Sequence, residues 1–63
     1  MKITLKAARV NANLSLKDVS EALNVSSKTI SSWERGITPI SAISIKQLSE
    51  LYNMPIDYIK IPM

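Results

Sequence analysis

The chain has no cysteine and no histidine among its 63 residues. Without thiols it can form neither a disulfide framework nor a thiolate metal site. Without imidazole it lacks the usual general base and the commonest metal ligand, and no serine has a histidine that could activate it as a nucleophile. We therefore expect no metal site, no cofactor and no enzymatic activity.

Glycine, proline and long apolar runs are also scarce. One Gly and three Pro in a chain that is 46% hydrophobic argue against disorder. No apolar run approaches the roughly 20 residues of a membrane span. Met1–Ile3 is interpreted as leading straight into a helix, without the pattern of a signal peptide. We expect a single domain over residues 1–63, located in the cytoplasm, with no membrane partner and no small-molecule ligand.

Positive charge is concentrated in the first half of the chain. Eight Lys/Arg and five Asp/Glu give a net charge of +3. Residues 1–35 hold six of the basic and three of the acidic residues, whereas residues 36–63 hold two of each. This asymmetry suits a surface that faces phosphates. An excess of three charges also fits simple solubility, so charge alone does not decide the function.

The stretch Leu16–Trp33, LKDVSEALNVSSKTISSW, predicts two short helices joined by a tight turn. Asn24 suits the left-handed position at the end of the first helix, and Ser26 can cap the second. This arrangement is a helix-turn-helix. Apolar residues follow the helical spacing of three and four in each half: Leu16, Val19 and Leu23, then Ile30 and Trp33.

The remaining periodicity completes an all-α fold of five short helices. We expect Thr4, Ser15 and Ser41 to cap helices and Gly36 to close the third one. The last residues alternate apolar and polar side chains and resemble a short strand more than a helix. The expected helices cover residues 4–12, 16–23, 27–35, 42–52 and 56–59, followed by a tail at 60–63.

The helix at residues 27–35 has two distinct faces. Ile30 and Trp33 form an apolar stripe, so we expect Trp33 to pack in the core and not to stack on a base. The opposite face carries only cations and hydroxyls, and lysine can read guanine acceptors in a major groove. An ordinary solvated helix presents a similar face. The residues of the polar face are Lys28, Ser31, Ser32 and Arg35, with Ser26 and Ser27 at its leading end.

The stretch Leu14–Gly36, LSLKDVSEALNVSSKTISSWERG, resembles the Cro/C1-type (XRE-like) helix-turn-helix family, and the resemblance covers about residues 4–59. It implies a lambda-repressor-like DNA-binding domain with helix 27–35 in the major groove. The implied function is that of a small transcriptional regulator of a bacterium or phage, similar to Cro or a repressor. Its partners would be a palindromic double-stranded operator and a second copy of the chain, at least on DNA. The alternative is a protein-interaction module, such as an antitoxin or adaptor, that uses the same fold.

The resemblance also implies roles for individual residues. Leu16 stands where the family often has Gln, and Ile37 stands where a basic residue is common, so we expect few phosphate contacts and a shallow salt dependence. The implied base-contacting residues are Ser26, Ser27, Lys28, Ser31 and Ser32. The implied phosphate-contacting residues are Lys17, Arg35, Gly36, Ile37 and Thr38.

Two further expectations concern pairing. Family members with Arg and Glu at the positions of Arg9 and Glu34 often pair them, although two solvated charges are the alternative. A dimer interface could involve the tail, the fifth helix, or exposed isoleucines at 40 and 43. The alternative for the tail is that its isoleucines, Ile59 and Ile61, only close the core.

Overall fold

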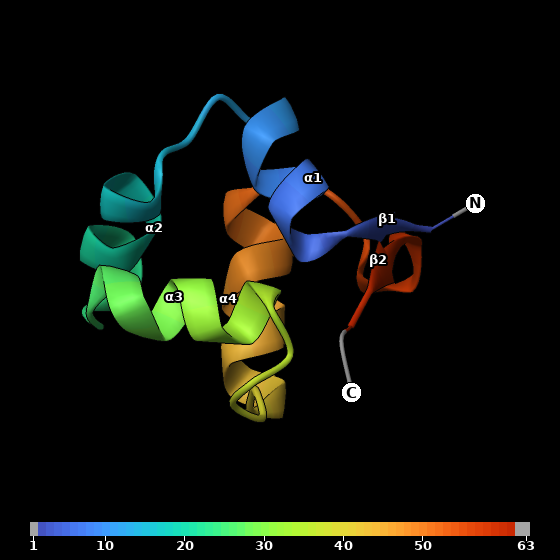
Figure 1. Cartoon of the computed structure of the whole chain (residues 1–63). Helices are drawn as coiled ribbons and strands as arrows, with labels where there is room; N and C mark the ends of the chain where they lie inside the picture. Colours follow the sequence, from blue (N-terminus) through green and yellow to red (C-terminus); the bar gives the residue numbers. More distant parts are fainter. Residues whose placement is uncertain (1, 62–63) are drawn as a thin grey trace.

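The structure is a computed structural model that describes residues 2–61 of the chain. Figure 1 shows α2 and α3 at one end of the molecule and a pair of short strands at the other, with α1 and α4 between them. In chain order the elements are β1 (Ile3–Thr4), α1 (Leu5–Asn11), α2 (Leu16–Leu23), α3 (Ser27–Glu34), α4 (Ala42–Leu51), the 3-10 helix η1 (Ile56–Tyr58) and β2 (Ile59–Lys60).

Two expectations about the ends of the domain are wrong. Ile3 belongs to a strand and not to a helical lead-in, and the expected fifth helix at 56–59 is the single 3-10 turn η1. β1 and β2 pair in parallel, with Ile3 opposite Ile59. Ile59 is buried and Lys60 is exposed, so the side chains alternate with a period of two, which a strand satisfies and a helix does not. The fold is mostly helical with a two-stranded sheet, and the tail residues Pro62 and Met63 lie outside the described residues.

Each α-helix in residues 2–61 begins after a hydroxyl side chain that accepts a backbone hydrogen bond. Ser15 and Asp18 form a reciprocal capping box, with distances of 2.9 and 3.0 Å. Within two residues of the end of each α-helix there is a residue with left-handed backbone, and the N–H that follows it bonds back to a carbonyl of the last turn. Gly36 follows the cap residue Arg35 and is not itself the cap. The N-caps are Thr4, Ser15, Ser26 and Ser41, and the left-handed residues are Asn13, Asn24, Gly36 and Asn53.

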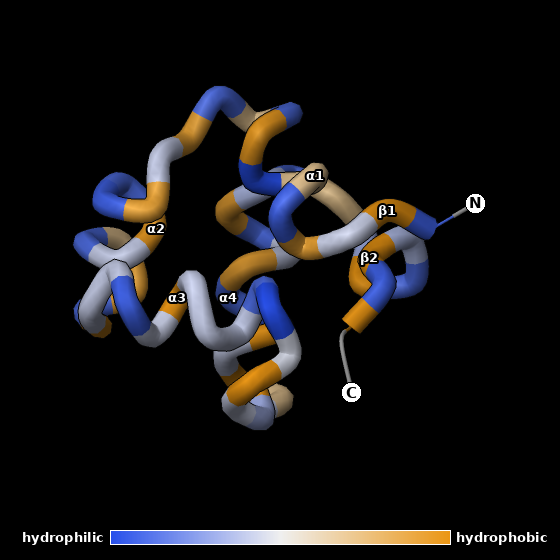
Figure 2. The backbone as a smooth tube through the Cα atoms, in the orientation of Figure 1, coloured by the Kyte–Doolittle hydropathy of each residue, from blue (hydrophilic) through white to orange (hydrophobic). Residues whose placement is uncertain are grey.

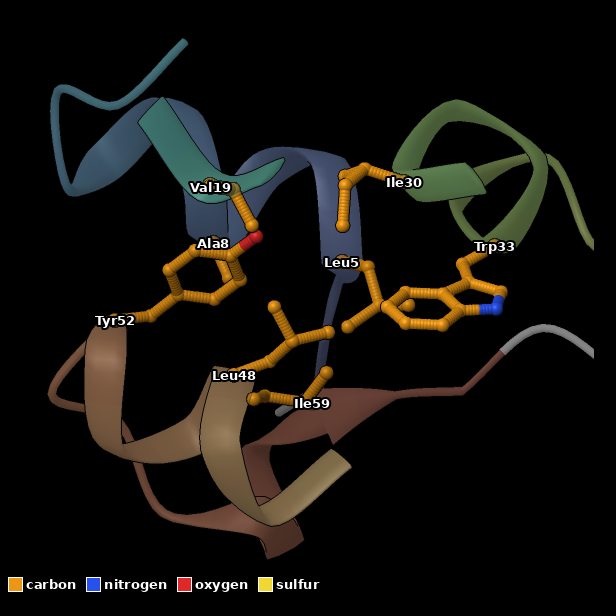
Figure 3. Close-up of a cluster of buried hydrophobic side chains, with 8 residues drawn as sticks. All are labelled: Leu5, Ala8, Val19, Ile30, Trp33, Leu48, Tyr52 and Ile59. Atoms are coloured by element: carbon orange, nitrogen blue, oxygen red, sulfur yellow. The ribbon is translucent and has the colours of Figure 1, made fainter. Parts of the chain in front are cut away.

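One apolar cluster joins all four α-helices to β2 (Figure 3). Trp33 is 8% exposed and Ile30 is 1% exposed, so the apolar stripe of α3 is directed into this cluster. Burial of Trp33 agrees with a packing role. The cluster consists of Leu5, Ala8, Val19, Ile30, Trp33, Leu48, Tyr52 and Ile59.

An ion pair connects α1 to the end of α3. The Arg9 Nε atom donates to Glu34 Oε2 at 2.7 Å, and Arg9 Nη2 donates to Glu34 Oε1 at 3.4 Å. Arg9 Nη1 also donates to the Leu14 carbonyl oxygen at 2.9 Å. The two side chains are only 11% and 8% exposed, and the hydrogen bond to Glu34 raises the pKa of Arg9. Arg9 therefore links α1, the corner before α2 and the last turn of α3.

Tyr52 places a polar atom inside the apolar cluster. Its side chain is 6% exposed, and its hydroxyl makes no hydrogen bond within residues 2–61. Figure 3 shows the hydroxyl directed toward Val19 and Ala8. Burial raises the pKa of Tyr52 to about 12, with the nearby Glu34 carboxylate adding to the rise. The phenol is therefore held in its neutral form far above neutral pH.

We expect Arg9→Ala to destabilise the domain by about 3–5 kcal/mol, because it leaves the Glu34 carboxylate buried without its cation. Urea denaturation followed by circular dichroism measures the loss. Glu34→Gln keeps a hydrogen-bond acceptor and should lose less, which provides a second reading if Arg9→Ala does not fold. Lys6→Ala removes an exposed charge from the same helix and should stay within about 0.5 kcal/mol of the parent. An Arg9→Ala variant as stable as Lys6→Ala would contradict a stabilising role of the ion pair.

The raised pKa of Tyr52 predicts alkaline sensitivity. The pKa of Tyr52 is higher in the folded domain than in the unfolded chain, so its contribution to the stability is complete below pH 10. Above pH 10 the unfolded chain loses the phenol proton first, and the contribution is lost as the pH rises through about 12. We expect Tyr52→Phe to be at least as stable as the parent at pH 7, since its hydroxyl is buried without a partner. The variant should also lose less stability between pH 9 and about 12. Tyr58→Phe is the matched control, because that ring is 57% exposed. Identical alkaline profiles for parent and Tyr52→Phe would rule the explanation out.

Candidate nucleic-acid interface

Small hydroxyl side chains hold α3 against α2. Ser20 is 6% exposed and lies where the two helices approach each other. Its Oγ donates to the Lys17 carbonyl oxygen at 2.8 Å and accepts from Ser27 Oγ at 3.3 Å. The Val25 N–H, directly after the left-handed Asn24, donates to the Ser20 carbonyl at 3.0 Å. These contacts fix the angle at which α3 leaves the turn.

The exposed face of α3 contains side chains with and without structural hydrogen bonds. Ser26 Oγ accepts from the Thr29 N–H at 3.1 Å and shares a hydrogen bond with Thr29 Oγ1 at 2.9 Å. Ser27 is bonded to Ser20, as described above. Among the hydrogen bonds of residues 2–61, none involves the side chains of Lys28, Ser31 or Ser32. Of the five predicted base-contacting residues, these three make no structural hydrogen bond; Lys28 is exposed, and Ser31 and Ser32 are half-buried. The other two also hold α3 in place.

The segment after α3 carries most of the predicted phosphate contacts, and it is exposed from Arg35 to Thr38. Two of its backbone donors are already used: the Gly36 N–H bonds to the Trp33 carbonyl at 3.2 Å, and the Ile37 N–H bonds to the Ser32 carbonyl at 3.0 Å. Neither donor is free for a phosphate. The Arg35 side chain and the Thr38 N–H are the donors that remain, because neither makes a hydrogen bond within the described chain.

The start of α2 offers less to a phosphate than a bare helix terminus. The Ser15 N–H and the Asp18 N–H are both used in the capping box. These bonds to Ser15 lower the pKa of Asp18, so its negative charge persists at the helix start. Leu16 adds no polar side chain there. Lys17 is exposed, so its side chain is a candidate phosphate donor at the start of α2.

Sequence reasoning missed one apolar feature beside α3. Residues 36–40, Ile45 and Ile61 line a hollow next to the predicted phosphate contacts. Ile40, expected to be exposed, is half-buried and packs against the core, whereas Ile43 is 73% exposed. The hollow combines the stretch 36–45 with Ile61, which is distant in sequence, so only the unusual number of isoleucines in 37–45 could have indicated it.

A metal-binding cluster and a membrane-spanning helix are both absent from residues 2–61. No group of three or more acidic residues there could hold a metal ion, and no helix there is long and apolar enough to cross a bilayer. The arrangement that the residues do form is a helix whose polar face carries exposed Lys28 and half-buried Ser31 and Ser32, with exposed Lys17 on α2 and exposed Arg35 directly after α3. Such an arrangement can donate to and accept from base edges and can contact phosphates.

Known proteins with similar sequences are regulators. A protein of Methanothermobacter thermautotrophicus, provisionally described as an HTH-type transcriptional regulatory protein, is 42% identical over 53 residues, which are 84% of this chain and 17% of that protein. The HTH-type transcriptional regulator ImmR of Bacillus subtilis is 34% identical over 55 residues, which are 87% of this chain and 43% of that protein. The chain therefore matches less than half the length of either relative.

No solved structure is significantly similar to the chain. Both curated relatives are described as transcriptional regulators and neither as an enzyme, in agreement with a non-enzymatic protein. The helix-turn-helix family matches residues 5–59, which extend from the start of α1 to the first residue of β2. This match over nearly the whole chain shows that it belongs to the Cro/C1-type helix-turn-helix family, as its central motif predicts.

Proposed function

We propose that the chain is the sequence-specific double-stranded DNA-binding part of a small transcriptional regulator and that α3 enters the major groove. The observation that carries the proposal is the pair of faces on α3. Ile30 and Trp33 anchor it in the core, while Lys28, Ser31 and Ser32 are free of structural hydrogen bonds within the described chain. A lysine can bind guanine O6 and N7, and a serine hydroxyl can donate or accept at a base edge.

The serines at the start of α3 take a secondary part in this proposal. The hydroxyls of Ser26 and Ser27 set the position of the helix, and they contact bases through the hydrogen-bonding capacity that remains. Phosphates on either side of the groove are bound by the side chains of Lys17 and Arg35 and by the Thr38 N–H. Gly36 and Ile37 determine the shape of the segment between Arg35 and Thr38. With so few donors, the affinity should depend only weakly on salt.

The regulator would act as a homodimer, at least on DNA. Half-sites recognised by helix-turn-helix dimers lie about 34–36 Å apart. The Cα positions of this domain extend 29 Å along its longest axis, so two copies on adjacent turns would lie side by side on one face of a palindromic operator. Occupying that operator in the cytoplasm would block or recruit polymerase.

The alternative function is a protein-interaction module, such as an antitoxin or adaptor. Exposed isoleucines favour it, since Ile37 is 63% and Ile43 is 73% exposed. Leu16 favours it as well, because it removes a polar side chain from the start of α2. Under this alternative the chain would enrich no operator from random DNA, although its fold would be intact.

The test is selection of duplexes from a random pool, followed by fluorescence anisotropy of parent and variants at two salt concentrations. We expect the parent to enrich a palindrome. Lys28→Ala/Ser32→Ala should lose about tenfold or more of the preference for it, because each base contact contributes roughly 1–3 kcal/mol of discrimination. Weak binding with the same shallow salt dependence as the parent should remain, since the few phosphate contacts are intact.

Lys6→Ala is the matched control, because it removes an exposed lysine from α1, which carries none of the proposed DNA contacts. It should keep the preference of the parent. Circular dichroism establishes that each variant is folded. A folded parent that enriches no duplex would contradict DNA reading by α3 and support the protein-interaction module instead.

A further inference from the structure

The hollow beside α3 has a volume of about 360 Å³ and is here named the α3–α4 pocket. Its lining comes from the loop at 36–40, from Ile45 of α4 and from Ile61 after β2. Figure 2 shows hydrophobic segments both in the loop after α3 and at the described end of the chain. Aliphatic side chains gain nothing from phosphate oxygens, so the proposed DNA contacts do not account for this pocket.

The pocket combines a fixed floor with an exposed rim. Ile40 and Ile61 pack against the core and are half-buried, whereas Ile37 is 63% exposed. Pockets that bind ligands typically measure about 300–1,000 Å³ and are mostly apolar. The α3–α4 pocket fits this description and can accommodate aliphatic side chains from another molecule.

Two segments that line the pocket are directly flanked by exposed cations: Arg35 precedes the loop, and Lys46 follows Ile45. Lys60 precedes Ile61, but the alternation of side chains along β2 directs it to the opposite face. No acidic residue occurs in residues 35–49 or 59–61. The acidic residues of the chain lie elsewhere: Asp18 and Glu21 on α2, Glu34 paired with Arg9, Glu50 lining a separate hollow against α2, and Asp57 in η1.

The charge of this surface decides between occupants. In a symmetric contact with a second copy, the two cations of each pocket would face those of the other, and like charges that oppose each other across an interface cost several kcal/mol. A segment that carries carboxylates would instead place opposite charges on Arg35 and Lys46.

We propose that the α3–α4 pocket binds a short extended segment of a partner protein in which apolar residues alternate with Asp or Glu. The apolar side chains fill the pocket, and the carboxylates meet Arg35 and Lys46 beside it. Arg35 also contacts phosphate in the proposed function, so this segment and DNA would compete for the domain. The competition rests on the proposed function, whereas binding of the segment does not.

The probe is a fluorescein-labelled octapeptide of alternating Glu and Leu, titrated with the chain in the absence of DNA. We expect saturable binding that weakens as salt increases, because the attraction to the cations is screened. A Lys–Leu octapeptide and a Glu–Ser octapeptide should bind at least about tenfold more weakly, since each lacks one half of the complementarity. Equal binding of the Lys–Leu peptide would overturn the role of charge, and equal binding of the Glu–Ser peptide would overturn the role of the pocket.

Two isoleucines of similar exposure provide the matched variants. Ile37→Glu adds a negative charge to the pocket rim, and we expect it to weaken binding of the Glu–Leu peptide by about tenfold or more. Ile43→Glu changes a side chain that is 73% exposed and does not line the pocket, so it should bind like the parent. Both sites are exposed, and circular dichroism establishes that both variants fold. Equal losses in the two variants would overturn the assignment of the peptide to this pocket.

Two further measurements separate this proposal from the others. Lys28→Ala/Ser32→Ala should bind the Glu–Leu peptide as the parent does, so a failure of DNA reading leaves the pocket test intact. Sedimentation equilibrium should show the same oligomeric state for the parent chain and for Ile37→Glu. A dimer of the parent that Ile37→Glu abolishes, together with no binding of the Glu–Leu peptide, would overturn the proposal and identify a second copy as the occupant.

Discussion

The placement of α3 depends on the buried ion pair between Arg9 and Glu34. The guanidinium reaches both carboxylate oxygens and the Leu14 carbonyl, so one side chain satisfies acceptors from α3 and from the corner before α2. A carboxylate that is 8% exposed would be costly without this cation, and the cation would be costly without the carboxylate. The pair therefore ties the last turn of α3 to α1 at one fixed position, and the exposed face of α3 inherits that orientation.

Short helices impose the second constraint. The α-helices have 7 to 10 residues, and isolated helices of this length are marginal in water. A hydroxyl at each start and a left-handed Asn or Gly at each end satisfy terminal N–H and C=O groups that the small core cannot. The residue after each left-handed position is apolar and covers the end of its helix, namely Leu14, Val25, Ile37 and Met54. Three of these four are half-buried, and Ile37 alone remains 63% exposed.

Such local signals explain why sequence reasoning placed the helices well and the two-stranded sheet only in part. The strand-like alternation at the end of the chain is confirmed by β2, whereas β1 was not expected. Caps and left-handed residues act within a few positions, so the bounds of α2 and the turn at Asn24 follow from neighbouring residues. The pairing of Ile3 with Ile59 joins residues from opposite ends of the chain, and no local pattern reveals it. The same limit applies to the site. The polar face of α3 can be inferred from helical periodicity, but the hydrogen bonds that occupy Ser27 and the Ile37 N–H depend on tertiary contacts.

The exposed Ile37 also bears on how the two proposed activities are related. It lies between Arg35, which the proposed function assigns to phosphate, and the apolar lining of the α3–α4 pocket. Carboxylates and phosphates have the same sign of charge, so both ligands would be attracted to this cation, and only one could occupy it. Binding free energies are reciprocal: a partner that weakens DNA binding is itself weakened by DNA to the same factor. An acidic partner could thus release the domain from DNA without altering the fold of α3, and a high-affinity operator would resist that release more than a weak one.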